Sequence, residues 1–446
     1  MINNRHTKFI SVLLVSLIFV SVFSFSVSAK DVWNCSKGDI FEFGSYPQTK
    51  VEDAQLLLKL NSCELNWISY DYYSGTGKWY DGKMESSDFM KYADVDFDGN
   101  KYRAVVFSQF RPYCTGLTSE SSYQDDNGYK ENTVYWFSYE PLRWRMLDAS
   151  EGFAVCESII DAQAYHNTLY YYSQDDTREY YQDDSCLVFA NNYKESSIRE
   201  WLNNDFSNTA FSENERKAIK ATDCDNSSWN PNYTEFNGGN TQDKVFLLSY
   251  NDVLNASYGF DSDRTKVDIF RQAKTTDYAV CQGLNVHNSD DEYSGNAWWW
   301  LRSPGSYSGS SCGVNFDGNA SHYYNTNYVL NGIRPALKLD IKALVPKTQV
   351  KAENIVVYYK NTNALETEIK EIEGVDYTAE YLSSDEKVAI VDENGNVTAK
   401  GRGTAEITCI LTDEYGNVTE DTCTVEVKLF WWQWIIYIVL FGWIWY

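Results

Sequence analysis

The sequence predicts a multidomain chain in which an α+β domain is followed by an all-β sandwich and one C-terminal transmembrane helix. Two apolar segments of different kinds flank it, residues 1–29 and 429–446. Residue usage changes near Pro346, from a region rich in Trp, Tyr and Asn to one rich in Val and Thr. The 446 residues are 43% apolar, enough for several buried cores. We therefore expect a signal peptide over 1–29, the α+β domain over 30–346, the sandwich over 350–428 and the transmembrane segment over 429–446.

The first apolar segment has the three parts of a cleavable export signal. Arg5 and Lys8 form a basic start, residues 9–25 form an apolar run, and Val-Ser-Ala at 27–29 forms a small-residue cleavage site. Because the apolar run is short and a cleavage site follows it, we expect removal rather than retention as a membrane anchor. The protein would then be exported, with its domains outside the cytoplasmic membrane.

The region 30–346 mixes strands with short helices. Ser197-Ile-Arg-Glu200 and Ser212-Glu-Asn-Glu215 have the capping-box pattern, in which the Ser hydroxyl and the Glu carboxylate each bind a backbone N–H at a helix start. Each predicts a helix of about two turns. Residues 244–249 predict a buried strand, which makes the region α+β. The apolar helix face consists of Trp201, Leu202, Phe206 and Phe211.

The region 350–428 alternates apolar and polar residues in short runs, as at 387–391 and 405–409. Asn394-Gly395 and Gly416-Asn417 supply turns between such runs. Short strands of this kind, regularly interrupted by turns, are typical of an antiparallel β-sandwich.

Within the sandwich, residues 383–408 carry the pattern S-S-D-x-x-V-A-x-V-D-x-x-G-x-V-T-A-x-G-x-G-T-A-x-I-T. This pattern resembles the bacterial immunoglobulin-like family of the group-two type. In that family the domain is a spacer or adhesion module on surface proteins. The resemblance therefore implies a stalk without chemistry of its own, placed directly before the last apolar segment.

Six blocks of the first region resemble an uncharacterised domain family common in exported proteins of Gram-positive anaerobes. The family has no established activity. Its last two blocks, W-L-R-S-P-G and G-I-R-P-A-L here, are also similar to the C-type-lectin-like fold of formylglycine-generating enzymes and related variable binding proteins. That likeness implies a lectin-like fold. The six blocks are residues 38–49, 139–148, 243–249, 276–279, 299–305 and 332–337.

The last apolar segment, 429–446, contains Gln433 and Gly442 among otherwise apolar residues. As a helix it would be about 27 Å long, which just spans a bilayer core. Trp and Tyr gather at both of its ends, as in the aromatic belts of membrane proteins. We expect it to anchor the protein to the cytoplasmic membrane. Because no Lys or Arg follows as a cytoplasmic stop, an interfacial or intersubunit apolar tail stays open.

The ten cysteines show no Cys-x-x-Cys spacing. Cys409 and Cys423 lie symmetrically about Gly416 in the predicted hairpin, where opposed cysteines can form a disulfide. We expect the other eight to be buried free thiols, and their pairing cannot be deduced from the sequence.

The sequence predicts neither a metal nor a cofactor. His166, His287 and His322 lie in no zinc-binding motif. Asp94-Val-Asp-Phe-Asp-Gly99 has the opening spacing of a calcium loop, but Val105 stands where the loop needs its bidentate Glu. A β-hairpin turning at Asp98-Gly99 explains these residues better.

The formal net charge of −25 describes a surface that repels phosphate backbones and anionic lipid headgroups. Nucleic-acid binding is therefore not expected. The charge also keeps an exported protein soluble.

The stretches 222–242, 284–297 and 304–328 are rich in Tyr, Asn, Ser and Gly, which predicts long ordered loops. Aromatic rings with polar tips in such loops resemble paratopes and sugar-binding surfaces. We expect the tryptophans at 298–300 to fill the core instead, with Arg302 and Arg334 paired to buried carboxylates. The candidate ligand-binding residues are Tyr307, Phe316, Tyr323, Tyr324 and Tyr328.

These features favour a non-catalytic cell-surface recognition or adhesion protein that binds a glycan or a protein. The alternative is an exported carbohydrate-active hydrolase or a formylglycine-oxidase-like enzyme. A hydrolase would need two carboxylates about 5–5.5 or 6.5–9.5 Å apart in one cleft. The oxidase resemblance implies closely spaced cysteines, whereas Cys281 and Cys312 are far apart in the sequence. A mainly structural envelope protein is the third hypothesis.

Overall fold

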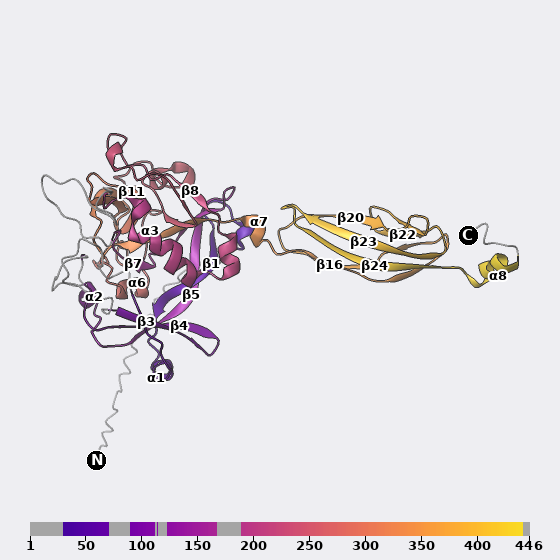
Figure 1. Ribbon diagram of the computed structural model, residues 1–446, viewed down its shortest axis with the longest axis horizontal. Helices are drawn as coiled ribbons and strands as arrows, with labels where there is room; N and C mark the ends of the chain where they lie inside the picture. Colours follow the sequence, from indigo (N-terminus) through magenta and orange to yellow (C-terminus); the bar gives the residue numbers. More distant parts are fainter. Residues whose placement is uncertain (1–29, 71–89, 112–113, 115–122, 167–188, 440–446) are drawn as a thin grey trace, which may run out of the picture.

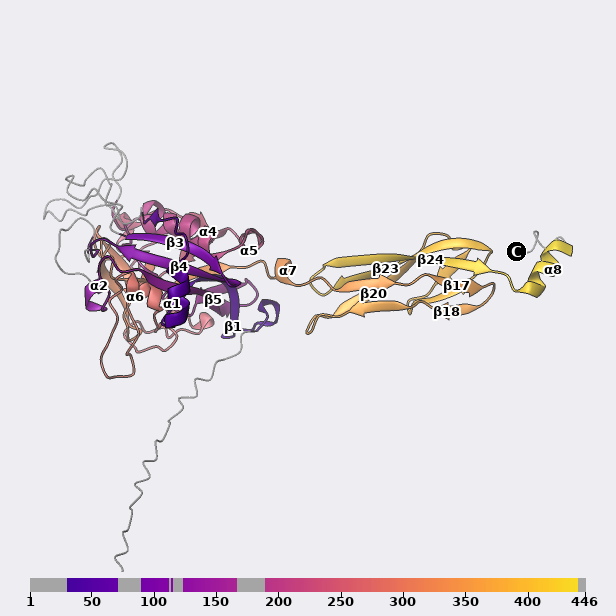
Figure 2. The same ribbon diagram turned by 90° about the horizontal axis from the view of Figure 1, so that it is seen from below.

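The computed structural model describes residues 30–70, 90–111, 114, 123–166 and 189–439. The predicted signal peptide and Cys186 lie outside these residues. The chain forms a rounded head followed by an elongated all-β domain, and a short helix stands at the far end of that domain (Figures 1 and 2). Strands dominate both parts, so the chain is a multidomain, mostly β protein.

An eight-stranded sheet forms the larger part of the head, with the order β10-β15-β6-β5-β4-β3-β2 and with β1 paired to β5. At the β3–β4 turn, Asp98 has a φ of 52° and Gly99 a φ of 78°, the left-handed pair that a two-residue hairpin requires. The predicted hairpin is confirmed. The strands are β1 (Ile40–Lys50), β2 (Ile68–Ser69), β3 (Met90–Phe97), β4 (Asn100–Phe107), β5 (Tyr135–Asp148), β6 (Phe153–Cys156), β10 (Val245–Leu247) and β15 (Pro335–Lys338).

A five-stranded sheet of order β13-β12-β11-β14-β7 completes the head. Side chains alternate along β11, so Trp299 and Trp300 enter two different hydrophobic cores, and both are fully buried. Arg302 lies 2.8 Å from Asp252, and Arg334 lies 4.0 Å from Glu157. The predicted core role is confirmed for Trp299 and Trp300, whereas Trp298 is half-buried and the carboxylates of Asp252 and Glu157 are partly exposed. The strands are β7 (Asp161–Ala162), β11 (Trp299–Pro304), β12 (Ser310–Val314), β13 (Ala320–Asn325) and β14 (Gly332–Ile333); β8 (Thr222–Cys224) pairs separately with β9 (Thr241–Asp243).

The helices of the head are short. The box at Ser212 is confirmed, because Ser212 accepts from Glu215 N while Glu215 Oε2 accepts from Ser212 N at 2.7 Å. The other predicted box is wrong by one residue. Ser196, not Ser197, is the N-cap, and its hydroxyl accepts from Arg199 N. The helices are α1 (Ala54–Leu60), α2 (Tyr123–Asp126), α3 (Ser197–Trp201), α4 (Ser207–Ala210), α5 (Glu213–Ala218), α6 (Asp277–Cys281) and α7 (Ile341–Leu344), with the π-helical η4 (Leu202–Phe206) and the 3-10 turns η1 (Val32–Asn34), η3 (Tyr193–Glu195), η5 (Thr234–Phe236), η6 (Asp252–Leu254) and η7 (Ala256–Tyr258).

The elongated domain is an immunoglobulin-like arrangement of small sheets, ordered β17-β24-β23-β20, β18-β22-β21 and β16-β19. The turns predicted at Gly395 and Gly416 are present, with φ values of 76° and 84°. Val357, Ile407 and Val425 are among its fully buried core residues. The strands are β16 (Gln349–Ala352), β17 (Ile355–Tyr358), β18 (Thr362–Ala364), β19 (Thr367–Lys370), β20 (Tyr377–Ser383), β21 (Ala389–Val391), β22 (Asn396–Ala399), β23 (Gly403–Asp413) and β24 (Val418–Lys428).

The cysteine pair of this domain departs from the expected register. Cys409 lies opposite Asp421, and Cys423 lies opposite Ile407, so the two cysteines are diagonal neighbours instead of a directly opposed pair. The structure has both as buried free thiols. The predicted Cys409–Cys423 disulfide is therefore not formed.

Few hydrogen bonds join the head to the elongated domain. Tyr415 Oη donates to Trp33 O at 3.2 Å, and Asn34 Nδ2 donates to Glu373 O at 3.4 Å. On the head side, both residues that form these bonds, Trp33 and Asn34, belong to η1. The contact orients the elongated domain without hiding the opposite side of the head (Figure 1).

The last described element is α8 (Trp431–Val439). In the described part of the chain, no helix has both the length and the apolar character needed to cross a bilayer. The transmembrane helix predicted over 429–446 is thus not found, and residues 440–446 lie outside the description.

Candidate functional site

The five predicted ligand-binding residues fall into two separate groups on and around the β12–β13 hairpin. Tyr307 donates through Oη to Tyr323 O at 3.4 Å and to Asn325 Oδ1 at 3.0 Å, and Asn325 Nδ2 donates to Tyr328 Oη at 2.9 Å. These contacts bring Tyr307, Tyr323 and Tyr328 together. Tyr323 is 59% exposed, while the others are half-buried.

Phe316 and Tyr324 form the second group, and both are half-buried, as Tyr307 and Tyr328 are. Phe316 stacks on His287 with ring centroids 3.9 Å apart and an interplanar angle of 7°. Tyr324 packs on Trp298 and Trp300, with centroids 6.0 and 6.1 Å away. Their rings pack against neighbouring aromatic side chains and remain partly exposed.

An aromatic row extends the first group. The Trp229 and His322 rings stack 3.8 Å apart at an angle of 10°, and the His322 and Tyr323 centroids are also 3.8 Å apart. We call Trp229, His322 and Tyr323 the aromatic row. Trp229 comes from the loop after β8, and the other two from β13, so the row joins segments far apart in the sequence.

The imidazole of the row is held in place and kept neutral. Ser306 Oγ lies 2.7 Å from His322 Nδ1. Burial, with help from the nearby positive charge of Arg264, lowers the pKa of His322 to about 4. The row is therefore uncharged at neutral pH.

Three buried polar atoms beside the row have no hydrogen-bond partner among the described residues: Trp229 Nε1, Ser228 Oγ and Tyr250 Oη. The Tyr250 ring lies 5.8 Å from that of Trp229. Unsatisfied buried polar atoms are rare in native proteins and often mark bound water or an absent ligand. The row thus exposes the ring of Tyr323, with the buried His322 and the half-buried Trp229 packed behind it next to unsatisfied polar atoms.

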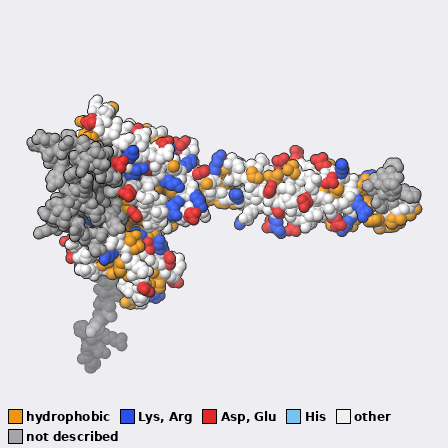
Figure 3. All heavy atoms as spheres, in the orientation of Figure 1, with side chains coloured by type: hydrophobic (Ala, Val, Ile, Leu, Met, Phe, Trp, Pro, Cys, Tyr) orange, Lys and Arg blue, Asp and Glu red, His pale blue; other side chains and the backbone are white. Residues whose placement is uncertain are grey.

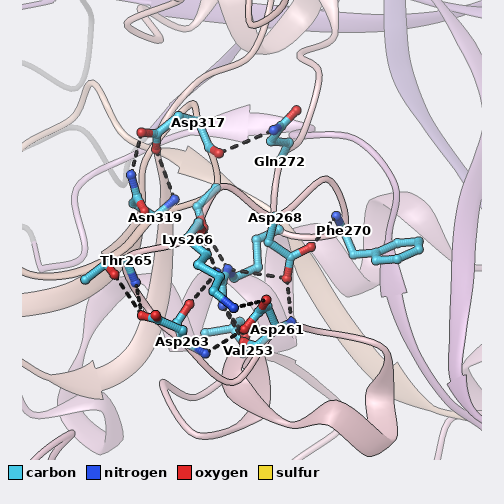
Figure 4. A network of polar contacts seen from close by, with 12 residues as sticks. Val253, Asp261, Asp263, Thr265, Lys266, Asp268, Phe270, Gln272, Asp317 and Asn319 are labelled. Atoms are coloured by element: carbon cyan, nitrogen blue, oxygen red, sulfur yellow. Dashed lines mark hydrogen bonds and ion pairs between the residues drawn. The ribbon is translucent and has the colours of Figure 1, made fainter.

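A buried arginine holds the hairpin that carries the row. Arg271 is fully buried and donates to five backbone carbonyls, those of Gly318 (2.7 Å), Asp261 (2.7 Å), Lys266 (2.8 Å), Asp263 (3.0 Å) and Val253 (3.2 Å). Asp268 Oδ2 lies 3.5 Å from its Nε. Figure 4 shows the loop residues Asp261, Asp263 and Asp268 gathered below Asp317 and Asn319 of the β12–β13 turn.

Gly318 allows the β12–β13 turn to approach the loop around Arg271 closely. Its φ is +90°, and a Cβ there would lie 2.4 Å from Asp268 O. A side chain cannot be accommodated without moving the loop backbone. The turn can therefore sit directly on the arginine-centred loop.

A small pocket lies elsewhere in the head, between the strands β1–β4 and the helices α3 and α4. Its volume is about 130 Å³, and it is lined by Tyr46, Ile68, Ser69, Tyr92, Arg103, Trp201, Asp205 and Thr209. Arg103 pairs in bidentate fashion with Asp94, at 2.7 and 2.8 Å, and its guanidinium lies 4.2 Å from the Tyr92 ring centroid. The pocket is below the size of ordinary small-molecule sites.

Asp161, behind this pocket, is fully buried and accepts from Tyr46 Oη at 2.8 Å and from Ala162 N at 2.7 Å. Burial raises its pKa to about 6.

The raised pKa of the Asp161 carboxyl favours folding below pH 4, and that contribution to the unfolding free energy is lost as pH rises through about 6. Relative to Asp161→Asn, the wild type should therefore lose about 3 kcal/mol of unfolding free energy between about pH 4 and 7. Urea denaturation across this range checks the difference, and parallel curves for the two proteins would refute it.

The thiols that an oxidase-like reaction would use are not activated. Cys281 and Cys312 are fully buried, and burial raises the pKa of each well above its ordinary value. A thiol with a raised pKa is a poor nucleophile at neutral pH. Among the described residues, no group of three or more His, Cys, Asp or Glu side chains could hold a metal ion.

The residues predicted from the sequence include Tyr307 and Tyr323 of this candidate site but not Trp229, His322, Ser228 and Tyr250. Trp229 lies in one of the aromatic loops singled out by composition, at 222–242. Its position beside β13 depends on contacts between residues more than ninety positions apart, as the Trp229–His322 stack shows. No local pattern reports such a contact.

Two family models match the chain. One, described as a domain of unknown function (DUF6273), covers residues 166–341, and the other, described as an intimin immunoglobulin-like domain, covers residues 366–413. No curated protein matches.

Solved structures match over small parts of the chain. An intimin mutant from EHEC O157:H7 is 22% identical over 15% of this chain and 33% of its own, with a TM-score of 0.12. An intimin–Tir90 complex gives 18% identity over 17% and 45%, with a TM-score of 0.13. Fibronectin(III)-like modules of Clostridium thermocellum CbhA give 16% identity over 18% and 97%, with a TM-score of 0.13. The chain thus spans less than half of the intimin chains that it matches, and it carries a DUF6273 domain followed by an intimin-type bacterial immunoglobulin-like domain.

Proposed function

We propose that this chain is a non-catalytic cell-surface recognition protein. Its lectin-like head binds a ligand at the aromatic row, the immunoglobulin-like domain spaces the head from the cell, and residues 429–446 attach the protein to the cytoplasmic membrane. The intimin-like domain indicates a surface protein of the adhesion type. Recognition by the head and the mode of attachment are the new parts of the proposal.

The observation that carries the proposal is the aromatic row. Tyr323 offers an exposed ring that continues into the stacked rings of His322 and Trp229. Flat rings with polar groups nearby suit the apolar faces and hydroxyls of a sugar, and they suit protein surfaces as well. The hairpin that carries the row follows β11, which lies in the part of the head remote from α7 and the elongated domain (Figure 1).

The charge of the aromatic row narrows the ligand class. The aromatic row is neutral at pH 7, so it offers no charge to attract a strongly anionic ligand. A neutral glycan is the ligand that fits best. A protein ligand is the other option, and one matched structure is a complex of intimin with Tir90.

Glycan and cell-wall arrays probed with the full chain in detergent test the proposal. Tyr323→Ala should weaken retention about 30-fold, the effect of losing about 2 kcal/mol at a central aromatic contact. Tyr323→Phe keeps the ring and should retain most of the binding. Leu58→Ala serves as the matched control, because Leu58 is 68% exposed on α1 and lies outside the row. Retention of nothing on the arrays, or equal retention by all variants, would refute the proposed site.

The neutrality of His322 gives a further expected result. Because its pKa is about 4, its charge does not change between about pH 5.5 and 8, and ligand affinity should stay constant over that range. Isothermal titration with a ligand found on the arrays measures this. An affinity that changes tenfold around pH 6.5 would show that His322 titrates in the site.

A further inference from the structure

The helix α8 is fixed to the end of the immunoglobulin-like domain. Phe430, just before it, stacks on Tyr358 with ring centroids 4.4 Å apart and an angle of 13°. Gln433 is buried, and its Oε1 accepts from Phe430 N at 2.8 Å. The first turn of α8 therefore has a defined position relative to β17 and β24.

Most side chains of this helix face solvent although they are strongly apolar. Trp431 is 76% exposed and Ile438 is 71% exposed. The surface continues onto β17, where Val356 and Tyr358 point to one side of the strand and are 44% and 41% exposed. Exposed apolar patches of this kind mark sites of contact with a partner or a lipid surface. The other exposed apolar residues of α8 are Trp432, Trp434, Ile435 and Val439.

Cationic side chains surround the same end of the domain. Arg402 lies over the Trp434 ring, 4.6 Å from its centroid. Lys428 lies opposite Tyr358 in the β17–β24 pair. Lys360 lies near Lys400, because Lys360 N donates to the carbonyl oxygen of Ala399, the residue before Lys400. We call Lys360, Lys400, Arg402 and Lys428 the basic collar. Figure 3 shows Lys and Arg side chains beside the hydrophobic end of the elongated domain.

The basic collar gathers four cationic side chains on a protein that is acidic overall, and the acidic Asp385 and Glu386 lie in the neighbouring turn, where Val388 O accepts from Lys400 N. Within the basic collar, Lys428 Nζ lies 2.9 Å from the carboxylate of Glu426 and forms an ion pair with it. The screening length at physiological salt is about 8 Å, so acidic groups on the distant head have little influence at the collar. The head and α8 lie at opposite ends of the molecule (Figures 1 and 2). The net charge of the whole protein therefore does not by itself determine how this end interacts with anionic lipid.

We propose that α8 and the basic collar form a docking surface for a bilayer rich in anionic lipids. The tryptophans and aliphatic side chains of α8 lie at the boundary between headgroups and acyl chains, and the collar contacts the anionic headgroups. The immunoglobulin-like domain then stands end-on upon the membrane. This inference rests on the membrane attachment in the proposed function and adds the lipid class and the residues that select it.

Flotation of the full chain with vesicles tests the inference, using neutral phosphatidylcholine vesicles and vesicles that also contain anionic phosphatidylglycerol. Each cation near an anionic surface contributes about fivefold to binding. Lys360→Glu with Lys400→Glu should therefore weaken binding to the anionic vesicles about 30-fold or more and leave binding to the neutral ones nearly unchanged. Arg402 is left intact because its contact with Trp434 orients α8.

Lys347→Glu with Lys370→Glu is the matched control, because it makes the same change in net charge near the head, where Gln349 pairs with Lys370. The control should bind as the wild type does, and high salt should remove the difference between vesicles. Equal binding to both vesicles, or equal effects of the two double variants, would overturn the lipid preference while leaving attachment intact. Failure to bind either vesicle would overturn the attachment itself.

Discussion

Arg271→Met should lower the unfolding free energy of the head by about 3–5 kcal/mol, the usual loss when one partner of a buried charged network is removed. Five carbonyls would lose their donor at once, and Asp268 would lose its cation. Urea denaturation followed by tryptophan fluorescence measures this, because ten of the fifteen tryptophans lie between residues 30 and 346, and the five after residue 430 are the same in both proteins.

Arg264→Met is the control for this variant. Arg264 belongs to the same loop, but its side chain is exposed, and its backbone O accepts from Ala320 N at 2.9 Å whatever the side chain. Its replacement should cost less than about 0.5 kcal/mol. Because Arg271 holds the turn that precedes Tyr323, Arg271→Met should also weaken ligand binding. Equal stabilities of the two variants would contradict the structural role of Arg271.

Trp300→Ala should cost about 3–5 kcal/mol of unfolding free energy, the range for removing a fully buried large aromatic side chain. Trp300 is 0% exposed, donates through Nε1 to Gln163 O at 2.9 Å, and packs edge-on against Tyr165 with centroids 5.6 Å apart. Chemical denaturation gives the value. A loss below about 1 kcal/mol would mean that Trp300 is not part of the core.

The comparison with Tyr323→Ala separates core from binding roles. Tyr323 is exposed, so its replacement should leave the unfolding free energy within about 0.5 kcal/mol of the wild type and should reduce ligand retention. Trp300→Ala should lower the unfolding free energy but keep ligand retention, measured at temperatures where the variant stays folded. If both variants lost stability equally, Tyr323 would be a packing residue and the aromatic row would not be a binding surface.

Elements determined by local chemistry could be predicted from the sequence. The Asp98-Gly99 turn requires left-handed backbone at both positions, which these residue types tolerate, and the Ser212–Glu215 box satisfies its own backbone donors. The alternation of apolar and polar residues, which predicted the sandwich, arises because each strand has one buried face. In each case the residues that determine the structure are neighbours in the sequence.

Register and loop packing could not be predicted in the same way. Symmetry about Gly416 placed Cys409 opposite Cys423, but Asp413 accepts from Tyr415 N and Asn417 N at 3.0 and 2.8 Å and shapes an asymmetric turn. The pairing is therefore displaced, and Cys409 lies opposite Asp421. Turn geometry decides register, and a shift of this size changes every pair of opposed residues.

The candidate site shows the same limit. Composition predicted a long loop over 304–328, but β12 and β13 lie within it. Tyr323 is exposed, whereas Phe316 and Tyr324 are half-buried against His287, Trp298 and Trp300. Whether an aromatic side chain faces solvent depends on which distant segment covers it. Net charge is a coarse guide for a related reason, because it averages over a length many times greater than the screening distance.

Surface labelling of intact cells that produce the protein tests the central claim most directly, which is that the acidic head is displayed outside the cell on the immunoglobulin-like domain. A membrane-impermeant amine reagent should modify Lys130 and Lys194, which lie in the head, before the cells are opened. The labelled protein should sediment with the membrane fraction and lack residues 1–29. Labelling that appears only after lysis, on a soluble chain that keeps those residues, would contradict the account.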